Sequence, residues 1–162
     1  METFEVTQAV MTVGSTYQVG SPGATAVLMT VKGSLMSPTP KFQLVSGDDG
    51  PELATLTGNF IKTKFQVKGA DSQELGNLSF PAIAFKKTLV LTVGGRGFTA
   101  DGGLMGGAFR CIDNDGKVGL EISYGKAEAF RDRFTVTIHD NVSKEVAILS
   151  SVAIHSRFFE FV

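Results

Sequence analysis

A short unit repeats along the chain: an alternating run, usually led by phenylalanine, then a cluster of Gly, Asp, Asn or Ser, and then a second run. Copies begin at Tyr17, Phe42, Phe65, Thr88, Phe109 and Phe134, those at Tyr17 and Thr88 being weaker versions. A strand, a polar turn and a second strand are the signature of a β-hairpin. A period of roughly 20 residues indicates one supersecondary unit used repeatedly.

Alternation within the repeats assigns the faces of the strands. Phe65 and Val67 lie on one side of a strand, and Gln66 and Lys68 lie on the other. One apolar face is typical of an antiparallel sheet with a single buried side. About 12 candidate strands are present, and because a flat sheet of that size would curl or split, closure into a barrel is expected.

The last copy departs from the repeat after its turn. Residues 143–158 are apolar on nearly every side, which predicts a buried helix, with Ser143 as its N-cap and Glu145 in the first turn. At 1.5 Å per residue this helix is roughly 24 Å long, shorter than the ~30 Å hydrocarbon core of a membrane. His155 and Arg157 also argue against a membrane span.

A barrel of about 12 strands has a backbone diameter of roughly 24 Å and needs a filling. A helix on its axis leaves about 9–10 Å to the sheet, which is ordinary layer spacing. The sequence therefore predicts a mainly β fold, a closed antiparallel barrel around a hydrophobic C-terminal helix, in one domain spanning residues 1–162. The predicted core of the helix is Val146, Ile148, Leu149, Val152, Ile154 and Phe158.

Composition narrows the partners and the compartment. The net charge of −1 gives no basic excess, so nucleic acid is not expected as a partner. Cys111 is the single cysteine, which cannot form an internal disulfide and suits a reducing compartment. The first residues lack the shape of a signal peptide. We expect a cytoplasmic domain, with peripheral membrane attachment as one possibility.

Two segments, "TVKGSLMSPTPKFQLVSGDDG" and "GNFIKTKFQVKGADSQEL", resemble LURP-one-related proteins. The ending "DRFTVTIHDNVSKEVAILSSVAIHSRFFEF" is similar to the C-terminus of phospholipid scramblases. Both families belong to the tubby-like superfamily, so the resemblance implies a closed 12-stranded barrel around a hydrophobic helix. It also implies work at membrane surfaces: phosphoinositide binding in tubby, calcium-linked lipid movement attributed to scramblases, and a defence role for LURP-one proteins.

The residues argue against a calcium site and hence against scrambling, the third functional hypothesis. Of the acidic segment of scramblases Asp132 remains, with Asp140 nearby, but Arg131 and Arg133 flank Asp132. The stretch "DNDGKVGLE" also fails the spacing of a calcium loop, because position 12 falls on Ile122 instead of Glu. A hairpin turn with Asp-Gly at its tip is predicted there.

Catalytic machinery is not expected, and neither is a cofactor or a metal. Cys111, His139 and His155 are the candidates for a nucleophile and its base, but Cys111 is predicted to point inward, His139 outward, and His155 lies on the core helix. The glycine-rich segment 94–107 is interpreted as tight turns and bulges, with a ligand loop as the alternative.

Basic residues supply the remaining candidate site. The set comprises Lys62, Lys64, Lys86, Lys87, Arg131 and Arg133. Alternation places Lys62 and Lys64 on one strand face, and each charge near an anionic membrane is worth about 1 kcal/mol. The leading hypothesis is a non-enzymatic module that binds phospholipid headgroups or membrane surfaces. The alternatives are a protein-interaction scaffold without lipid affinity, and an ordinary solvated exterior for these residues.

Overall fold

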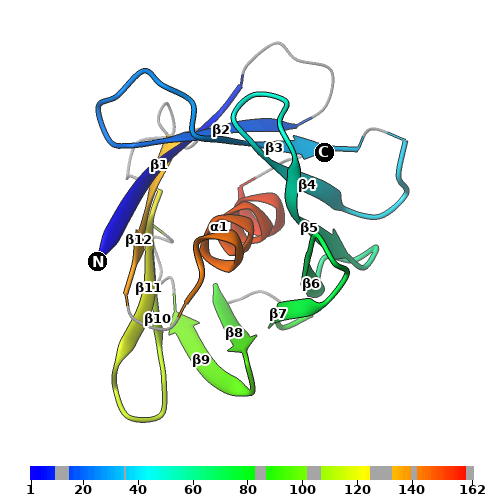
Figure 1. Ribbon diagram of the computed structural model, residues 1–162. Coiled ribbons are helices and arrows are strands. Elements are labelled where there is room, and N and C mark those ends of the chain that lie inside the picture. The colour runs from blue at the N-terminus through cyan, green and yellow to red at the C-terminus, as the bar shows by residue number, and fades with distance from the viewer. Residues whose placement is uncertain are drawn as a thin grey trace.

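The computed structural model describes residues 1–9, 15–34, 36–82, 87–101, 107–124, 133–139 and 142–159. Its elements are β1 (Glu2–Gln8), β2 (Thr16–Gly20), β3 (Met29–Gly33), β4 (Lys41–Ser46), β5 (Glu52–Gly58), β6 (Lys64–Gly69), β7 (Glu74–Ser79), β8 (Thr88–Val93), β9 (Arg96–Asp101), β10 (Ala108–Ile112), β11 (Val118–Ser123), β12 (Arg133–Ile138) and α1 (Lys144–Phe158). Each strand pairs with the next in the chain, and β1 pairs with β12, which closes the barrel (Figure 1). The predicted barrel around a C-terminal helix is confirmed.

The repeated unit corresponds to the hairpins of the barrel. The copies from Phe42, Phe65 and Phe109 form β4–β5, β6–β7 and β10–β11, and the weaker copies form β2–β3 and β8–β9. The copy from Phe134 supplies β12 and then α1. Polar turns therefore separate the strands of each hairpin, as the sequence predicts.

Two of the repeats place a phenylalanine opposite a glycine on the neighbouring strand. Gly58 pairs with Phe65 and Gly33 pairs with Phe42. A Cβ added to Gly58 would lie 2.6 Å from the Phe65 ring, closer than carbon atoms approach. The aromatic ring thus occupies the space that a side chain at position 58 would need.

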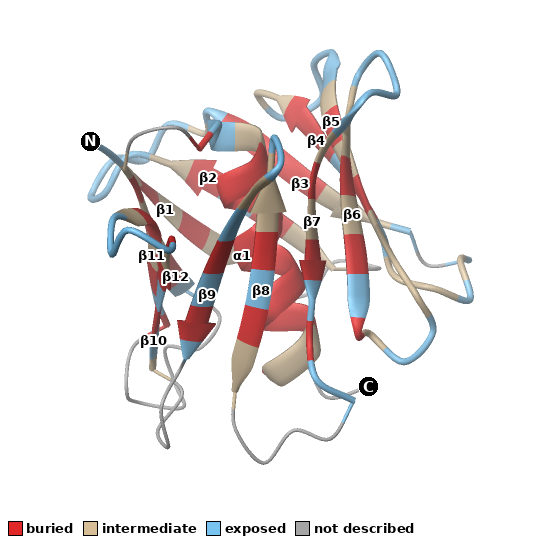
Figure 2. Ribbon diagram, turned by 90° about the horizontal axis from the view of Figure 1, so that it is seen from below, coloured by how far each residue is buried: buried red, intermediate tan, exposed pale blue. Residues whose placement is uncertain are grey.

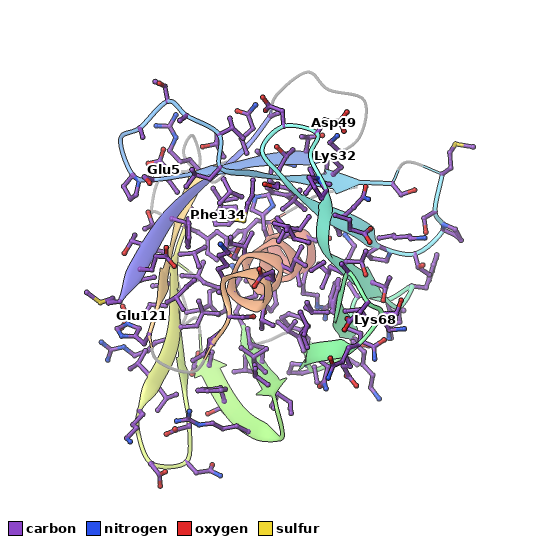
Figure 3. All side chains as sticks on the ribbon, in the orientation of Figure 1. Glu5, Lys32, Asp49, Lys68, Glu121 and Phe134 are labelled. Carbon is purple, nitrogen blue, oxygen red and sulfur yellow. The ribbon has the colours of Figure 1, made fainter. Side chains whose placement is uncertain are left out.

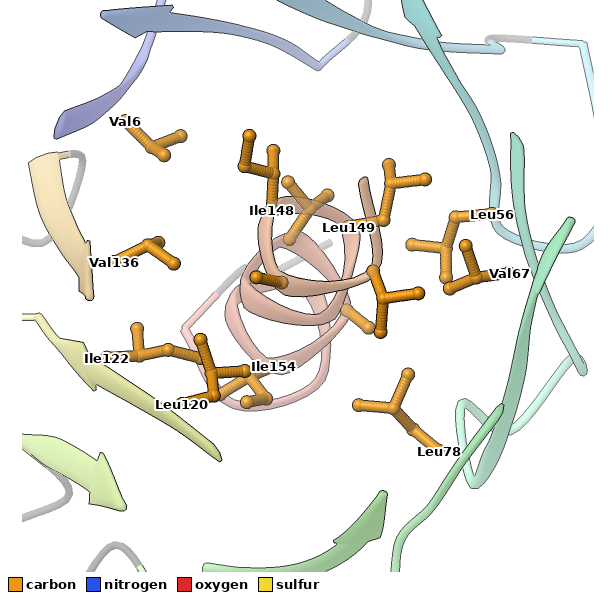
Figure 4. Close-up of a cluster of buried hydrophobic side chains, with 14 of the residues drawn as sticks. Val6, Leu56, Val67, Leu78, Leu120, Ile122, Val136, Ile148, Leu149 and Ile154 are labelled. Atoms are coloured by element: carbon orange, nitrogen blue, oxygen red, sulfur yellow. The ribbon is translucent and has the colours of Figure 1, made fainter. Parts of the chain in front are cut away.

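The helix α1 runs through the barrel with buried residues on all its sides (Figure 1). Its N-cap is Ser143, whose Oγ accepts a hydrogen bond from the Val146 amide at 3.3 Å, with Glu145 in the first turn, as predicted. The predicted helix core is confirmed: Val146, Ile148, Leu149, Val152 and Ile154 are buried, and Phe158 packs half-buried against the core. Figure 4 shows side chains from β1, β5, β6, β7, β11 and β12 pointing toward Ile148, Leu149 and Ile154 of the helix.

The strands alternate between an inner and an outer face. On β12, Phe134, Val136 and Ile138 are buried, while Thr135 and Thr137 between them are partly exposed. In Figure 3 Phe134 lies inside the wall, whereas Glu5, Lys68 and Glu121 lie on its outer side. The burial colours of β8 and β9 show the same alternation (Figure 2).

The barrel has two ends, named here after the ends of α1. The helix starts near β7, where the Val146 side chain approaches Gly76, and it ends beside the β5–β6 connection. Because neighbouring strands are antiparallel, even-numbered strands begin at the C-terminal mouth and odd-numbered strands end there. The C-terminal mouth is at the lower side of Figure 2. Among the described residues, no helix is long and apolar enough to cross a bilayer.

Candidate functional site

The β5–β6 connection, residues 59–63, is a structured turn at the C-terminal mouth. The Asn59 side-chain oxygen accepts hydrogen bonds from the amides of Thr63, at 2.8 Å, and Lys64, at 3.1 Å. Lys62 has a positive φ of 56° and lies in this turn, two residues before β6 begins. The prediction that Lys62 and Lys64 share a strand face is therefore wrong, because the Asn59-centred turn interrupts the alternation.

The side chains of two cations contact the end of α1 and the loops beside it. Lys62 Nζ donates to the carbonyl oxygen of Ser156 at 3.0 Å. Arg157 donates to the carbonyl oxygens of Ile61, at 3.3 Å, and Pro81, at 3.0 Å. These cations lie where the carbonyl end of a helix carries a partial negative charge, so they stabilise the helix terminus.

Three further lysines complete one sector of this mouth. Lys87 Nζ lies over the Phe159 ring at 4.6 Å from its centroid and over the Phe158 ring at 5.9 Å. Lys41 and Lys64 are exposed at the first positions of β4 and β6. We call Lys41, Lys62, Lys64, Lys87 and Arg157 the basic rim.

The structure brings together only part of the basic set predicted from sequence. Lys62, Lys64 and Lys87 lie in the rim, whereas Arg133 begins β12, on the other side of the ring of strands from β6. Lys86 and Arg131 lie outside the described residues. Sequence reasoning missed Lys41 and Arg157. The position of Arg157 in the last turn of a predicted helix was the available signal for it.

Charge is distributed unevenly between the two mouths. Of the acids in the described ranges, Asp101 alone lies at the C-terminal mouth, at the end of β9. Most others lie at the N-terminal mouth: Glu2, Asp48, Asp49, Glu52, Asp71, Glu74, Asp113, Asp115 and Glu145. In the sequence, segments 83–86, 125–132 and 160–162 carry three basic and three acidic residues, a net charge of zero. The described C-terminal mouth is therefore positive.

The three candidates for acid–base or nucleophilic chemistry have separate environments. Cys111 is fully buried in β10, and this burial raises the pKa of its thiol to about 12. His139 lies on the outer wall, with Nε2 3.7 Å from Glu121 Oε1. His155 is buried on α1, where its Nδ1 is 3.0 Å from the Tyr17 hydroxyl. Among the described residues, no cluster of three or more His, Cys, Asp or Glu could hold a metal ion.

Asp113 has a structural role in the β10–β11 turn. Its Oδ1 accepts hydrogen bonds from the amides of Asp115 and Lys117, each at 2.9 Å, and its Oδ2 pairs with Arg96. The Arg96 side chain, followed by the Lys117 amide, holds the pKa of Asp113 below its ordinary value. Gly116 takes a φ of 80° beside them. The stretch "DNDGKVGLE" is thus a hairpin turn, as predicted.

The glycine-rich segment is a turn where the structure describes it. Gly94 and Gly95, with φ of 57° and 79°, form the tight β8–β9 connection. A backbone with φ > 0 is easily adopted by glycine, which explains the pair. Residues 102–106 of the segment lie outside the described residues.

A groove of about 700 Å³ is lined by residues of β7, β8, β9 and β10. Among the described residues, the one pair in register between β9 and β10 is Ile112 with Thr99. The groove is lined by Pro81, Leu89, Val90, Ala100, Arg110 and Ile112, among others. It is largely apolar and contains Val90, one of the large side chains exposed on the outer wall.

Comparison with known proteins gives no assignment: no protein-family model matches the chain, and no curated protein matches its sequence.

Proposed function

We propose that this barrel is a non-enzymatic module that binds anionic phospholipid surfaces through its C-terminal mouth. The observation that carries the proposal is the basic rim, five cations in one sector of a mouth whose described residues include a single acid. Each cation held near an anionic surface contributes about 1 kcal/mol. The proposal keeps the resemblance to tubby-like, LURP-one-related and scramblase proteins as a hypothesis, and it includes a cytoplasmic location, peripheral at a membrane.

Geometry supports headgroup binding by the rim. Lys62 and Arg157 are anchored by contacts to backbone carbonyls, and each has donors beyond those that these contacts use. Lys41 and Lys64 project from strand ends into solvent. Cations that are already ordered lose less conformational entropy when they contact phosphate groups.

Flotation with liposomes tests the proposal. Vesicles of phosphatidylcholine with phosphatidylserine should capture the protein, vesicles of phosphatidylcholine alone should not, and capture should fall with salt. Lys41→Glu with Lys64→Glu should lower partitioning at least ~30-fold, since two cations worth about 1 kcal/mol each are lost. Lys117→Glu with Lys144→Glu, the same charge change on exposed residues of the N-terminal mouth, is the matched control. Equal capture of both double variants would refute the proposal, as would absence of capture of the wild type.

A second candidate function is a scaffold that binds an extended peptide, favoured by the apolar groove over β7–β10. Between β9 and β10 the described pairing is that of Ile112 with Thr99, a shorter ladder than most others in the barrel. A peptide can hydrogen-bond to a strand edge and place an apolar side chain beside Val90. Recovery of a defined protein partner whose binding is lost on Val90→Glu, with vesicles ignored, would favour this function.

A further inference from the structure

The C-terminal mouth exposes large apolar side chains on two neighbouring loops. Phe60 is 78% exposed and Ile61 is 58% exposed in the β5–β6 connection, and Met36 is 93% exposed in the β3–β4 connection. The two loops are adjacent, since the amide of Gly58 donates to the carbonyl of Pro40 at 2.8 Å. Solvent-facing turns are ordinarily polar, so consecutive Phe and Ile at a tip need an explanation.

The tip formed by Phe60 and Ile61 is held in place. Besides its two bonds to backbone amides, Asn59 donates from Nδ2 to Thr63 Oγ1 at 2.8 Å. Lys62, the residue after Ile61, donates from its side chain to the Ser156 carbonyl, and Arg157 donates to the Ile61 carbonyl. The fold therefore fixes these two side chains outward and does not leave the loop free to collapse onto the barrel.

The charges around Phe60 and Ile61 indicate what kind of partner these side chains bind. Lys62 and Lys64 lie within three residues after Ile61, and Lys41 begins the strand beyond the Met36 loop. Connections 36–40 and 59–63 contain no acid. Apolar side chains beside cations complement an anionic bilayer, in which apolar groups are buried about 5–10 Å into the boundary between headgroups and acyl chains. A protein partner would have to supply both an apolar pocket and acidic groups around it, whereas an anionic membrane surface offers both features together.

We propose that Phe60 and Ile61, with Met36 beside them, insert into the acyl-chain boundary of an anionic membrane while the basic rim contacts the headgroups. This inference rests on the proposed function and adds to it an orientation: the C-terminal mouth faces the bilayer and the acidic N-terminal mouth faces away. The charges attract the barrel to the surface, and the apolar tip fixes its angle and depth.

A tryptophan reporter tests insertion directly, because the chain contains no tryptophan. Phe60→Trp places the reporter at the tip, and Leu28→Trp places a control at the N-terminal mouth, where Leu28 is 44% exposed. The probe is a vesicle of phosphatidylserine with phosphatidylcholine brominated on its acyl chains. We expect the emission of the Phe60→Trp protein to shift to the blue and to be quenched by the bromines. The emission of the Leu28→Trp protein should stay unchanged.

A second pair of substitutions separates failure of insertion from failure of membrane binding. Phe60→Ser with Ile61→Ser should reduce flotation roughly tenfold or more, while keeping every rim charge. Insertion would be overturned, with the proposed function left standing, if the Phe60→Trp protein floated without a shift or quenching of its emission. If vesicles captured the double serine variant as well as the wild type, insertion would likewise be overturned and the proposed function would stand. No flotation of the wild type would overturn both. Quenching in the Leu28→Trp protein in place of the Phe60→Trp protein would reverse the orientation and overturn this inference.

Discussion

The phenol of Tyr17 on β2 and the imidazole of His155 on α1 meet inside the barrel, with 3.0 Å between the hydroxyl oxygen and Nδ1. Their rings are nearly perpendicular, at 87°, with centroids 5.5 Å apart. His155 also stacks on Phe134 of β12, at 5.4 Å. This polar pair joins the helix to the wall near the β1–β12 closure, as does the buried Tyr124 hydroxyl, which donates to the Ser151 carbonyl at 2.7 Å.

Replacing Tyr17 with Phe should destabilise the fold by about 1–2 kcal/mol, because a buried imidazole nitrogen loses this hydrogen-bonding partner. Urea unfolding followed by circular dichroism measures the change. An unchanged midpoint, with an unchanged slope, would show that the Tyr17–His155 contact contributes nothing to stability.

Leu149→Ala should cost about 2–5 kcal/mol, since it leaves a cavity between the helix and the wall. Val90→Ala on the outer wall is the control and should change stability by no more than about 0.5 kcal/mol. The same urea experiment compares the two variants. Similar losses for both would contradict the assignment of α1 as the core of the barrel.

Lys62 offers a test of backbone conformation, because its φ is 56°. Lys62→Ala and Lys62→Gly both remove the bond from Nζ to Ser156. Glycine adopts positive φ without strain, so the Gly variant should be more stable than the Ala variant by about 1 kcal/mol. Thermal unfolding of the two proteins gives the difference, and equal stability would argue against the left-handed turn.

Cys111 should resist thiol reagents in the folded protein. Burial raises the pKa of the thiol to about 12, so the reactive thiolate is absent near neutral pH. Ellman's reagent at pH 8 should label no thiol in the native state and one per chain in guanidinium. Above the ordinary thiol pKa of 9.0 the unfolded chain loses the thiol proton, whereas the folded chain keeps it. The free energy of unfolding should therefore fall as pH rises above 9.0. Rapid labelling without denaturant would contradict the burial.

Asp113 should contribute to acid sensitivity. Its pKa lies below the ordinary value of 3.8 in the folded state, mainly because of Arg96, so its contribution is present above that value and is lost as pH falls through the lower one. Asp113→Asn should lower the melting temperature at pH 7 by more than it does at pH 2. Melting curves at the two pH values provide the check, and an equal loss at both would exclude the ion pair as the cause.

The regular parts of the fold could be predicted because each repeat carries its own local signals. These signals depend only on neighbours in the chain: the alternation around Phe65, the polar turn after Val67 and the apolar surface of residues 143–158. The closed barrel then follows from the strand number and from the need to bury an all-apolar helix.

The candidate site was less predictable, because it combines residues from distant segments. Lys62 contacts Ser156, which is 94 residues away, and no local sequence pattern predicts that contact. The alternation Lys62, Lys64, Gln66 favoured an extended strand, while the side chain of Asn59 directs the backbone into a turn. Phe60 and Ile61 would ordinarily be assigned to the core by composition, and only the topology shows them at a mouth.

The position of α1 at the end of the order of elements has a consequence for biosynthesis. During translation every strand emerges before the helix that fills the barrel. One edge of β1 stays unpaired until β12, the last strand of the barrel, has been made. Until then the nascent chain carries an unpaired edge and a continuous apolar face, the features that holdase chaperones recognise. Ribosome-bound chains that stop before α1 should therefore be protease-sensitive and chaperone-associated, and emergence of α1 from the ribosome should allow the barrel to fold.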